Sequence, residues 1–214
     1  IQSFFSLLFP EKNIAFTGAY TRQLEIIHEL EIVLDDSIQN MVKVLSGGED
    51  FEIIEENEAD LLCRISVGIK IRLYSCDSKN RMKLIFMKSC SDEFATAFTQ
   101  QFPSIDYSTC INEEAVFNQA SLQFIPACQR EKALTLNWAK QHALPSLLAV
   151  SDIKGIIHSH SNWSDGSNTI EEMANKAIEK GFEYLVISDH SKSAFYANGL
   201  KEERLKEQHA YIDA

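Results

Sequence analysis

Hydrophobic positions in the first ninety residues change repeatedly between strand-like and helix-like spacing. Ile, Leu and Val concentrate in residues 23–34, which predicts a strand. Apolar residues then recur at three- and four-residue intervals in 38–45, between a Ser that can cap a helix and a Gly-Gly pair that can end it, which predicts a helix. The segments 61–66, 69–75 and 82–87 predict further strands. We therefore expect an α+β region with neighbouring, mainly antiparallel strands.

The pattern in residues 88–145 is weaker and mostly helical. Apolar spacing predicts helices over 92–102 and 112–120. Residues 124–145 are interpreted as a connector that ends in a short helix over 132–142.

The last sixty residues have the clearest pattern. A short apolar strand (GIIHSHS) runs into polar residues, and Thr169 with Glu172 has the T-x-x-E spacing of a capping box. An apolar helical stripe follows and ends at Gly181, before a second apolar strand at 184–187. A strand, a helix and a strand joined by short loops predict a βαβ unit with parallel strands.

Composition restricts the class of protein. The 214 residues contain 31 Asp and Glu against 20 Lys and Arg, giving a formal net charge of −11, which argues against strong non-specific DNA binding. The five cysteines are odd in number and lack the CxxC spacing of zinc sites, so a reducing, cytoplasmic location fits best. No apolar run is long enough to span a membrane. The chain begins with Ile1 and has no signal-peptide pattern, and we interpret this start as a cut point.

Metal-ligating residue types follow both C-terminal strands. His158 and His160 are two residues apart on extended backbone, so their side chains are expected on one side, where they could hold one metal ion. Asp165 follows in a Ser-Asp-Gly loop, and Asp189-His190 ends the second strand. Parallel strands place all of these groups at one sheet edge, which suits Zn, Mn or Fe. Separately, each feature has a structural explanation, because Ser-Asp-Gly is a common turn and Asp-His could cap a helix.

The same segments resemble a known family. HSHSNWSDG, TIEEMANKAIEKGFEYLVISDHSKS and GLKEERLKEQ look like the start of a PHP (polymerase and histidinol phosphatase) domain at the C-terminal end of bacterial family X DNA polymerases. The resemblance implies a distorted (β/α)7 barrel with a three-metal phosphoesterase site. It further implies that His158 and His160 hold one metal, and that Asp165 and His190 belong to another. Ile156 stands where the family usually has Asp, and the family's later ligands have no counterpart, so we expect a fragment that is inactive alone.

The upstream region is similar to the polymerase part of the same family. FTGAYTRQLEIIHELEIVL looks like its palm segment, and that alignment places Glu29, Glu31 and Arg72 at the three catalytic aspartate positions. Ala19 stands for the usual Ser, Met87-Lys88-Ser89 stands for the Thr-Gly-Ser of the nucleotide pocket, and helix-hairpin-helix units are absent from the sequence. Two-metal phosphoryl transfer needs clustered carboxylates, so a guanidinium at the third position implies lost polymerase activity. Arg72 could pair with Glu29 or Glu31, or all three could be ordinary exposed residues.

The sequence thus predicts an α/β chain with an α+β polymerase-like region followed by the first βαβ unit of a PHP barrel. The expected parts are a degenerate palm-like region (1–88), a thumb-like region (89–135), a linker (136–154) and the N-terminal part of a PHP domain (155–214). The expected function is metal-dependent 3′–5′ exonuclease or related phosphoesterase activity in DNA processing or repair, with weak DNA binding. Two alternatives remain, which are a phosphatase for a small phosphoester and a non-catalytic interaction module.

Overall fold

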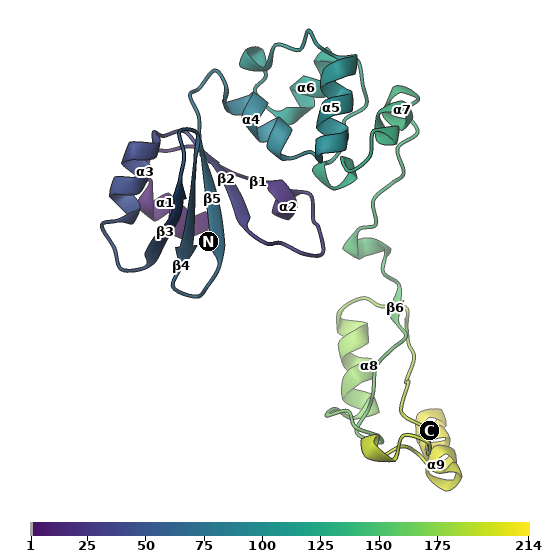
Figure 1. Cartoon of the computed structure of the whole chain (residues 1–214). Helices are drawn as coiled ribbons and strands as arrows, with labels where there is room; N and C mark the ends of the chain where they lie inside the picture. The colour runs from purple at the N-terminus through teal and green to yellow at the C-terminus, as the bar shows by residue number, and fades with distance from the viewer. Residues whose placement is uncertain (1) are drawn as a thin grey trace. The chain divides into compact units, whose positions relative to one another are not determined.

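The computed structural model describes the backbone of residues 2–214 and the side chains from Phe4 onward, so that Ile1 lies outside the described residues. The chain is a mixed α/β protein with two compact units, which meet in sequence between Pro145 and Ser146 (Figure 1).

A five-stranded mixed sheet forms the first part of the N-terminal unit. Its strand order is β1-β2-β5-β4-β3, and β2 and β5 are parallel whereas the other neighbours are antiparallel. The expectation of mainly antiparallel pairing is therefore confirmed, with β2–β5 as the exception. The strands are β1 (Ile14–Thr17), β2 (Leu30–Leu34), β3 (Phe51–Glu56), β4 (Asp60–Ile65) and β5 (Lys70–Ser75).

Helices α1 (Gln2–Leu8) and α3 (Ile38–Leu45) pack against this sheet. The predicted helix at 38–45 is confirmed, and its start is fixed by Ser37, whose Oγ accepts a hydrogen bond from the Asn40 N–H at 3.2 Å. The buried face of α3 joins side chains from the central strands in one apolar core.

The strand predicted over 23–34 is only partly formed, because β2 begins at Leu30. Its neighbour β1 ends at Thr17, where the chain turns into the short helix α2 (Gly18–Thr21) at a Gly18 φ of +66°. Residues 22–29 therefore have no strand to pair with on that side. A positive φ of +58° at Gln23 also interrupts extended backbone.

Helices make up the rest of the N-terminal unit. The prediction of a strand at 82–87 is wrong, because these residues lie in helix α4. The helices predicted at 92–102, 112–120 and 132–142 are confirmed with somewhat different ends. The helices are α4 (Arg81–Lys88), α5 (Asp92–Gln101), α6 (Glu113–Gln119) and α7 (Leu134–Lys140).

A buried arginine organises the core of these helices. The Arg130 side chain is fully buried, its Nε donates to the Ile125 carbonyl at 2.8 Å, and its guanidinium forms an ion pair with Glu113. The guanidinium carbon also lies 5.0 Å from the ring centre of Phe117. The ion pair, the hydrogen bond and the aromatic contact together offset the cost of burying this charge.

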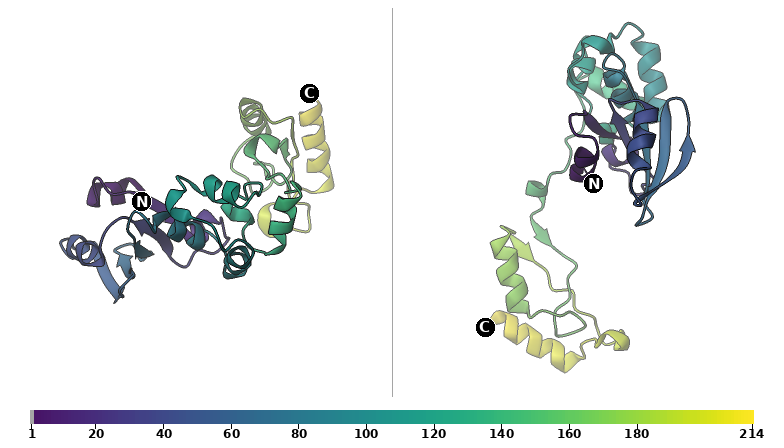
Figure 2. Two further views of the ribbon diagram at one scale, coloured as in Figure 1. Left: turned by 90° about the horizontal axis from the view of Figure 1, so that it is seen from above. Right: turned by 90° about the vertical axis from the view of Figure 1, so that its left-hand side faces the viewer.

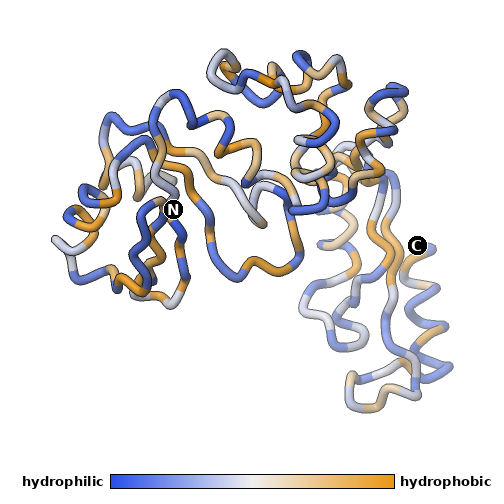
Figure 3. Tube along the Cα trace, turned by 45° about the horizontal axis from the view of Figure 1, so that its top comes forward, coloured by the Kyte–Doolittle hydropathy of each residue, from blue (hydrophilic) through white to orange (hydrophobic). Residues whose placement is uncertain are grey.

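The C-terminal unit begins with the predicted βαβ arrangement. Strands β6 (Gly155–Ile156) and β7 (Tyr184–Leu185) are parallel. Figure 3 shows the hydrophobic stretches of the chain in orange and the hydrophilic stretches in blue. Helix α8 (Ile170–Glu179) lies alongside the strand pair in Figures 1 and 2. Helix α9 (Glu202–Asp213) ends the unit.

The capping box predicted for α8 is also confirmed. The Thr169 hydroxyl accepts from the Glu172 N–H at 3.1 Å, and the Glu172 carboxylate accepts from the Thr169 N–H at 2.8 Å. At the other end, Gly181 has a φ of +76°, as expected of a glycine that terminates a helix.

Candidate metal centre

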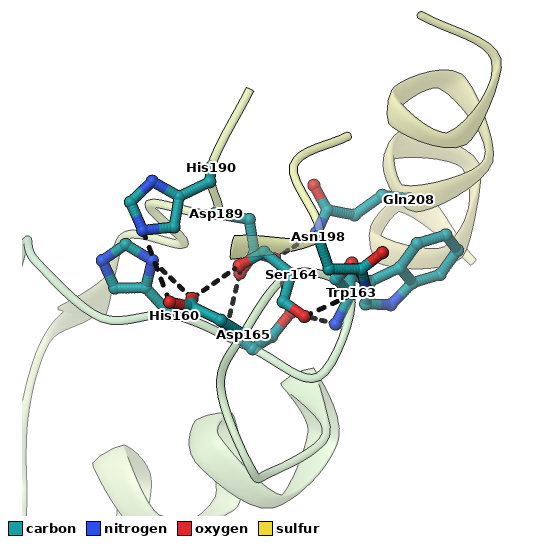
Figure 4. A network of polar contacts seen from close by, with 9 residues as sticks. His160, Trp163, Ser164, Asp165, Asp189, His190, Asn198 and Gln208 are labelled. Carbon is teal, nitrogen blue, oxygen red and sulfur yellow. Dashed lines mark hydrogen bonds and ion pairs between the residues drawn. The ribbon is translucent and has the colours of Figure 1, made fainter. Parts of the chain in front are cut away.

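Three of the predicted ligands converge at one edge of the β6–β7 pair. His160 follows β6, Asp165 lies in the loop before α8, and His190 follows β7. Because the two strands are parallel, their carboxyl ends meet at this edge. One nitrogen or oxygen atom from each of the three side chains lies within 4.8 Å of the others (Figure 4).

The spacing within this cluster fits a bound cation. Nδ1 of His160 lies 3.4 Å from Oδ1 of Asp165, and Nε2 of His190 lies 3.5 Å from Oδ2 of the same carboxylate. Two ligand atoms that each lie about 2.1 Å from a tetrahedral metal ion are separated by about 3.4 Å. In addition, Nδ1 of His160 is buried without a hydrogen-bond partner among the described residues. A buried imidazole nitrogen without such a partner is what a metal ligand requires.

His158 lies beside this group of three residues. Its side chain is exposed, and its ring centre lies 5.3 Å from that of His160. The closely spaced group contains His160 with Asp165 and His190, and it does not contain His158. In the structure His160 is therefore grouped with the two residues that the family resemblance assigned to another metal.

Asp189, which directly precedes His190, accepts hydrogen bonds that hold the residues around the cluster in place. Its carboxylate accepts hydrogen bonds from the Ser161 N–H at 2.6 Å, the Ser164 hydroxyl at 2.7 Å and the Gln208 amide at 2.5 Å, and also from the Ser161 hydroxyl. Burial raises the pKa of Asp189, but these hydrogen bonds outweigh burial and hold its pKa below the usual value. The loop that carries Asp165, residues 161–168, is called the ligand loop. A charged Asp189 therefore ties the ligand loop to the segment that carries His190.

A glycine allows the ligand loop to fold tightly. The Gly166 N–H donates to the Ser161 carbonyl at 2.9 Å, and a Cβ atom at residue 166 would lie 2.0 Å from the His160 carbonyl oxygen. Any other residue at this position would force the loop open. The Gly of the predicted Ser-Asp-Gly turn is thus required by close backbone contact.

Helix α9 also holds the loop. The Arg204 guanidinium donates to the Trp163 carbonyl and to the Asn198 carbonyl and side chain, and the Asn198 amide donates to the Ser164 carbonyl at 3.1 Å. Sequence reasoning missed these supporting residues. The serines that follow His160 in HSHSNWSDG could have indicated Ser161 and Ser164, but no local signal connects Gln208 to an aspartate nineteen residues earlier.

The three residues at the polymerase-like positions lie in the N-terminal unit. The Arg72 Nε lies 2.6 Å from Oε1 of Glu29, and its Nη1 lies 2.6 Å from Oδ1 of Asp60. Glu31 instead accepts a hydrogen bond from the Tyr74 hydroxyl at 2.7 Å. Of the two pairings considered from the sequence, the structure shows the one between Arg72 and Glu29. The Arg72 side chain is 20% exposed and the Glu29 side chain is 26% exposed.

The other polymerase-like positions have internal structural contacts. The Ser89 hydroxyl is buried and lies 3.0 Å from that of Thr17, and Lys88 lies 4.2 Å from the ring centre of Tyr74. A Cβ atom at Gly18, which precedes Ala19, would lie 1.9 Å from Oε1 of Glu31. This close approach and the Gly18 φ of +66° both favour glycine at residue 18.

Comparison with known proteins identifies the C-terminal part. Residues 157–211 match the PHP domain family. They are PHP-domain sequence. The chain is also 52% identical over 68 residues to the DNA polymerase/3'-5' exonuclease PolX of Bacillus subtilis (strain 168). This alignment covers 32% of the present chain and 12% of that relative. The similarity to PolX is thus confined to the aligned segment, and the candidate metal centre lies inside the residues that match the PHP domain family. None of the described helices has the length and apolar character needed to cross a membrane.

Proposed function

We propose that the PHP segment supplies metal ligands to a phosphoesterase that cleaves phosphodiester bonds in DNA. The observation that carries this proposal is the convergence of His160, Asp165 and His190 within 4.8 Å in PHP-domain sequence. The similarity to a relative named as a 3'-5' exonuclease supports DNA as the substrate class.

Each residue has a defined part in this proposal. The imidazoles of His160 and His190 and the carboxylate of Asp165 hold a divalent cation, with Zn, Mn or Fe as candidates. When bound, such a cation supplies an activated water and neutralises phosphate charge. His158 is proposed as a further ligand on the exposed side of the cluster, and Asp189 is a positioning residue that keeps the loop and His190 together.

Metal analysis combined with an exonuclease assay tests this proposal. In the full-length protein, we expect His160→Ala and His190→Ala to lose bound metal, with hydrolysis of a 3′-labelled single strand reduced at least about 100-fold. His209→Ala is the matched control, because His209 is an exposed histidine of the same unit outside the cluster. Unchanged metal content and hydrolysis in both cluster variants would refute the assignment, and a metal-free wild-type protein would favour a non-catalytic interaction module.

The acidic charge favours a second candidate, a phosphatase for a small phosphoester. With a net charge of −11, the chain has little excess positive charge for binding a phosphate backbone. Binding of a labelled single strand, measured across a range of salt concentrations, separates the two. Affinity that falls steeply with salt supports DNA, whereas no binding at low salt, together with hydrolysis of a small phosphomonoester, supports the alternative.

We further propose that the N-terminal unit is a palm-like and thumb-like region without DNA synthesis activity. The support is the placement of Arg72, whose guanidinium occupies the space between the Glu29 and Asp60 carboxylates. A fixed cation there opposes the binding of divalent ions, which two-metal phosphoryl transfer requires. We expect no nucleotide incorporation on a primed template. Incorporation that disappears in Glu29→Gln and Glu31→Gln variants would contradict this proposal.

A further inference from the structure

Two aromatic side chains are strongly exposed beside the candidate metal centre. Phe195 is 86% exposed and Tyr196 is 79% exposed, and both lie in the short 3-10 helix η4 (Phe195–Ala197) that follows the Asp189-His190 strand end. Large exposed apolar surfaces of this kind commonly mark binding sites.

The sequence of the turn explains why the rings face outward. Ala194 and Ala197 are three residues apart, and residues at this spacing lie on the same face of a 3-10 helix. Both alanines are buried, at 9% and 4% exposure. The two intervening aromatic residues are therefore directed into solvent.

Two hydrogen bonds from the residues that follow the turn tie it to the segments that carry the candidate ligands. The Leu200 N–H donates to the His190 carbonyl at 2.7 Å, and the Asn198 amide donates to the Ser164 carbonyl, one residue before Asp165. A Cβ atom at Gly199 would lie 1.9 Å from the Ser191 carbonyl oxygen, so the backbone is closely packed here. The exposed rings thus project from a fixed support and are held close to the cluster.

The rings also lie close enough to the cluster to contact the same substrate. The Tyr196 ring centre lies 6.3 Å from that of His190, and Phe195 and Tyr196 are 5.8 Å apart in an edge-to-face arrangement. The neighbouring Lys192 is paired with Glu202, so it adds little free positive charge. The chemistry beside the cluster is therefore aromatic, which suits a flat ring better than a phosphate.

We propose that Phe195 and Tyr196 form a stacking platform for an unpaired nucleobase of the strand whose phosphodiester reaches the metal centre. This inference rests on the proposed DNA phosphoesterase function. Stacking on an aromatic side chain is tolerant of sequence, because every base has a π face, and it needs no basic groove. The platform selects single-stranded ends, since a paired and stacked base does not offer its face.

Fluorescence of 2-aminopurine tests the platform without requiring hydrolysis. A single-stranded oligonucleotide with 2-aminopurine at its 3′ end is added to the intact protein in EDTA, and stacking is read as quenching. We expect quenching by the wild-type protein and its loss in Phe195→Ala/Tyr196→Ala, with affinity reduced about five- to hundredfold. Phe195→Tyr/Tyr196→Phe retains both rings and is expected to restore quenching.

A matched control is Ile178→Ala, which removes a 72% exposed apolar side chain elsewhere in the same unit. Quenching that persists in the double alanine variant would overturn the platform, as would its absence in the wild-type protein. In the latter case, a change of oligomeric mass in the double variant would assign the rings to contact with a second copy. Quenching without metal-dependent hydrolysis would leave the platform standing and refute the phosphoesterase proposal, so the two failures are distinguishable.

Discussion

At the residue scale, Asp189 is the central side chain of the C-terminal unit although it is outside the group of close ligands. Its lowered pKa means that the folded state binds protons less readily than the unfolded chain. Its stabilising effect is therefore present above the unfolded carboxyl pKa of about 3.9 and is lost as pH falls through the lower folded value.

We expect Asp189→Asn to lower the free energy of unfolding of the C-terminal unit by about 1–3 kcal/mol at pH 7, because charged hydrogen bonds are lost. The difference from wild type is expected to shrink as pH falls below about 4, where the carboxyl group of the unfolded chain begins to bind protons, and to be lost as pH falls through the lower pKa of the folded state. Urea unfolding at several pH values measures this. Asp213→Asn, at an exposed position of α9, is the control, and a difference that does not change with pH would contradict the explanation.

Arg72 gives a second prediction at this scale. Arg72→Gln leaves the Glu29 and Asp60 carboxylates without their partner, so we expect a loss of about 1–3 kcal/mol in the stability of the N-terminal unit. Adding Glu29→Gln should recover part of the loss, which a double-mutant cycle quantifies. Arg64→Gln breaks the more exposed pair with Glu52 and should cost less than about 0.5 kcal/mol. Equal losses for the two arginines would contradict this reasoning.

The candidate metal ligands were partly predictable because their chemistry is local. Histidines and an aspartate directly after two strands indicate a shared sheet edge, and the structure brings His160, Asp165 and His190 together there. The orientation of His158 was not predictable in this way. Strict alternation holds only on extended backbone, and β6 already ends at Ile156.

At the scale of elements, the capping box of α8 determines how the ligand loop joins the helix. Thr169→Ala removes a hydrogen bond to the Glu172 N–H and should reduce stability by about 1 kcal/mol, whereas Thr169→Ser should retain most of it. Chemical unfolding of the C-terminal unit measures both. A serine variant as unstable as the alanine variant would show that the hydroxyl hydrogen bond is not the cause.

Helix α4 shows why some elements were misread. MKLIFM is a short apolar run, and a run of this length does not distinguish a buried strand from a buried helix segment, although its Met, Lys and Leu residues favour helices. The buried residues Ile85, Phe86, Ser89 and Cys90 recur at three- and four-residue steps. A turn at Asp77, whose carboxylate accepts from the Asn80 N–H at 2.7 Å, precedes the helix and was an available signal. Residues 82–87 alone are too short a window to show the helical periodicity of the buried residues, which extends to residue 90.

At the scale of the whole molecule, the segment between the two units is a predicted site of cleavage. Leu148 is 93% exposed and Val150 is 84% exposed, next to the division after Pro145. We expect limited proteolysis with chymotrypsin or elastase to cut first within residues 146–153 and to leave two resistant products, which mass spectrometry identifies. First cuts inside the sheet or inside α8 would contradict the division.

The ion pair at Arg72 has a consequence for how the chain responds to its surroundings. In the N-terminal unit, the positive charge that neutralises the carboxylates is covalently part of the chain, so no chelator can remove it. In the PHP segment, the corresponding role is proposed for an exchangeable ion held by His160, Asp165 and His190. Depletion of divalent metals should thus empty the proposed metal centre of the C-terminal unit and leave the electrostatics around Arg72 in the N-terminal unit unchanged.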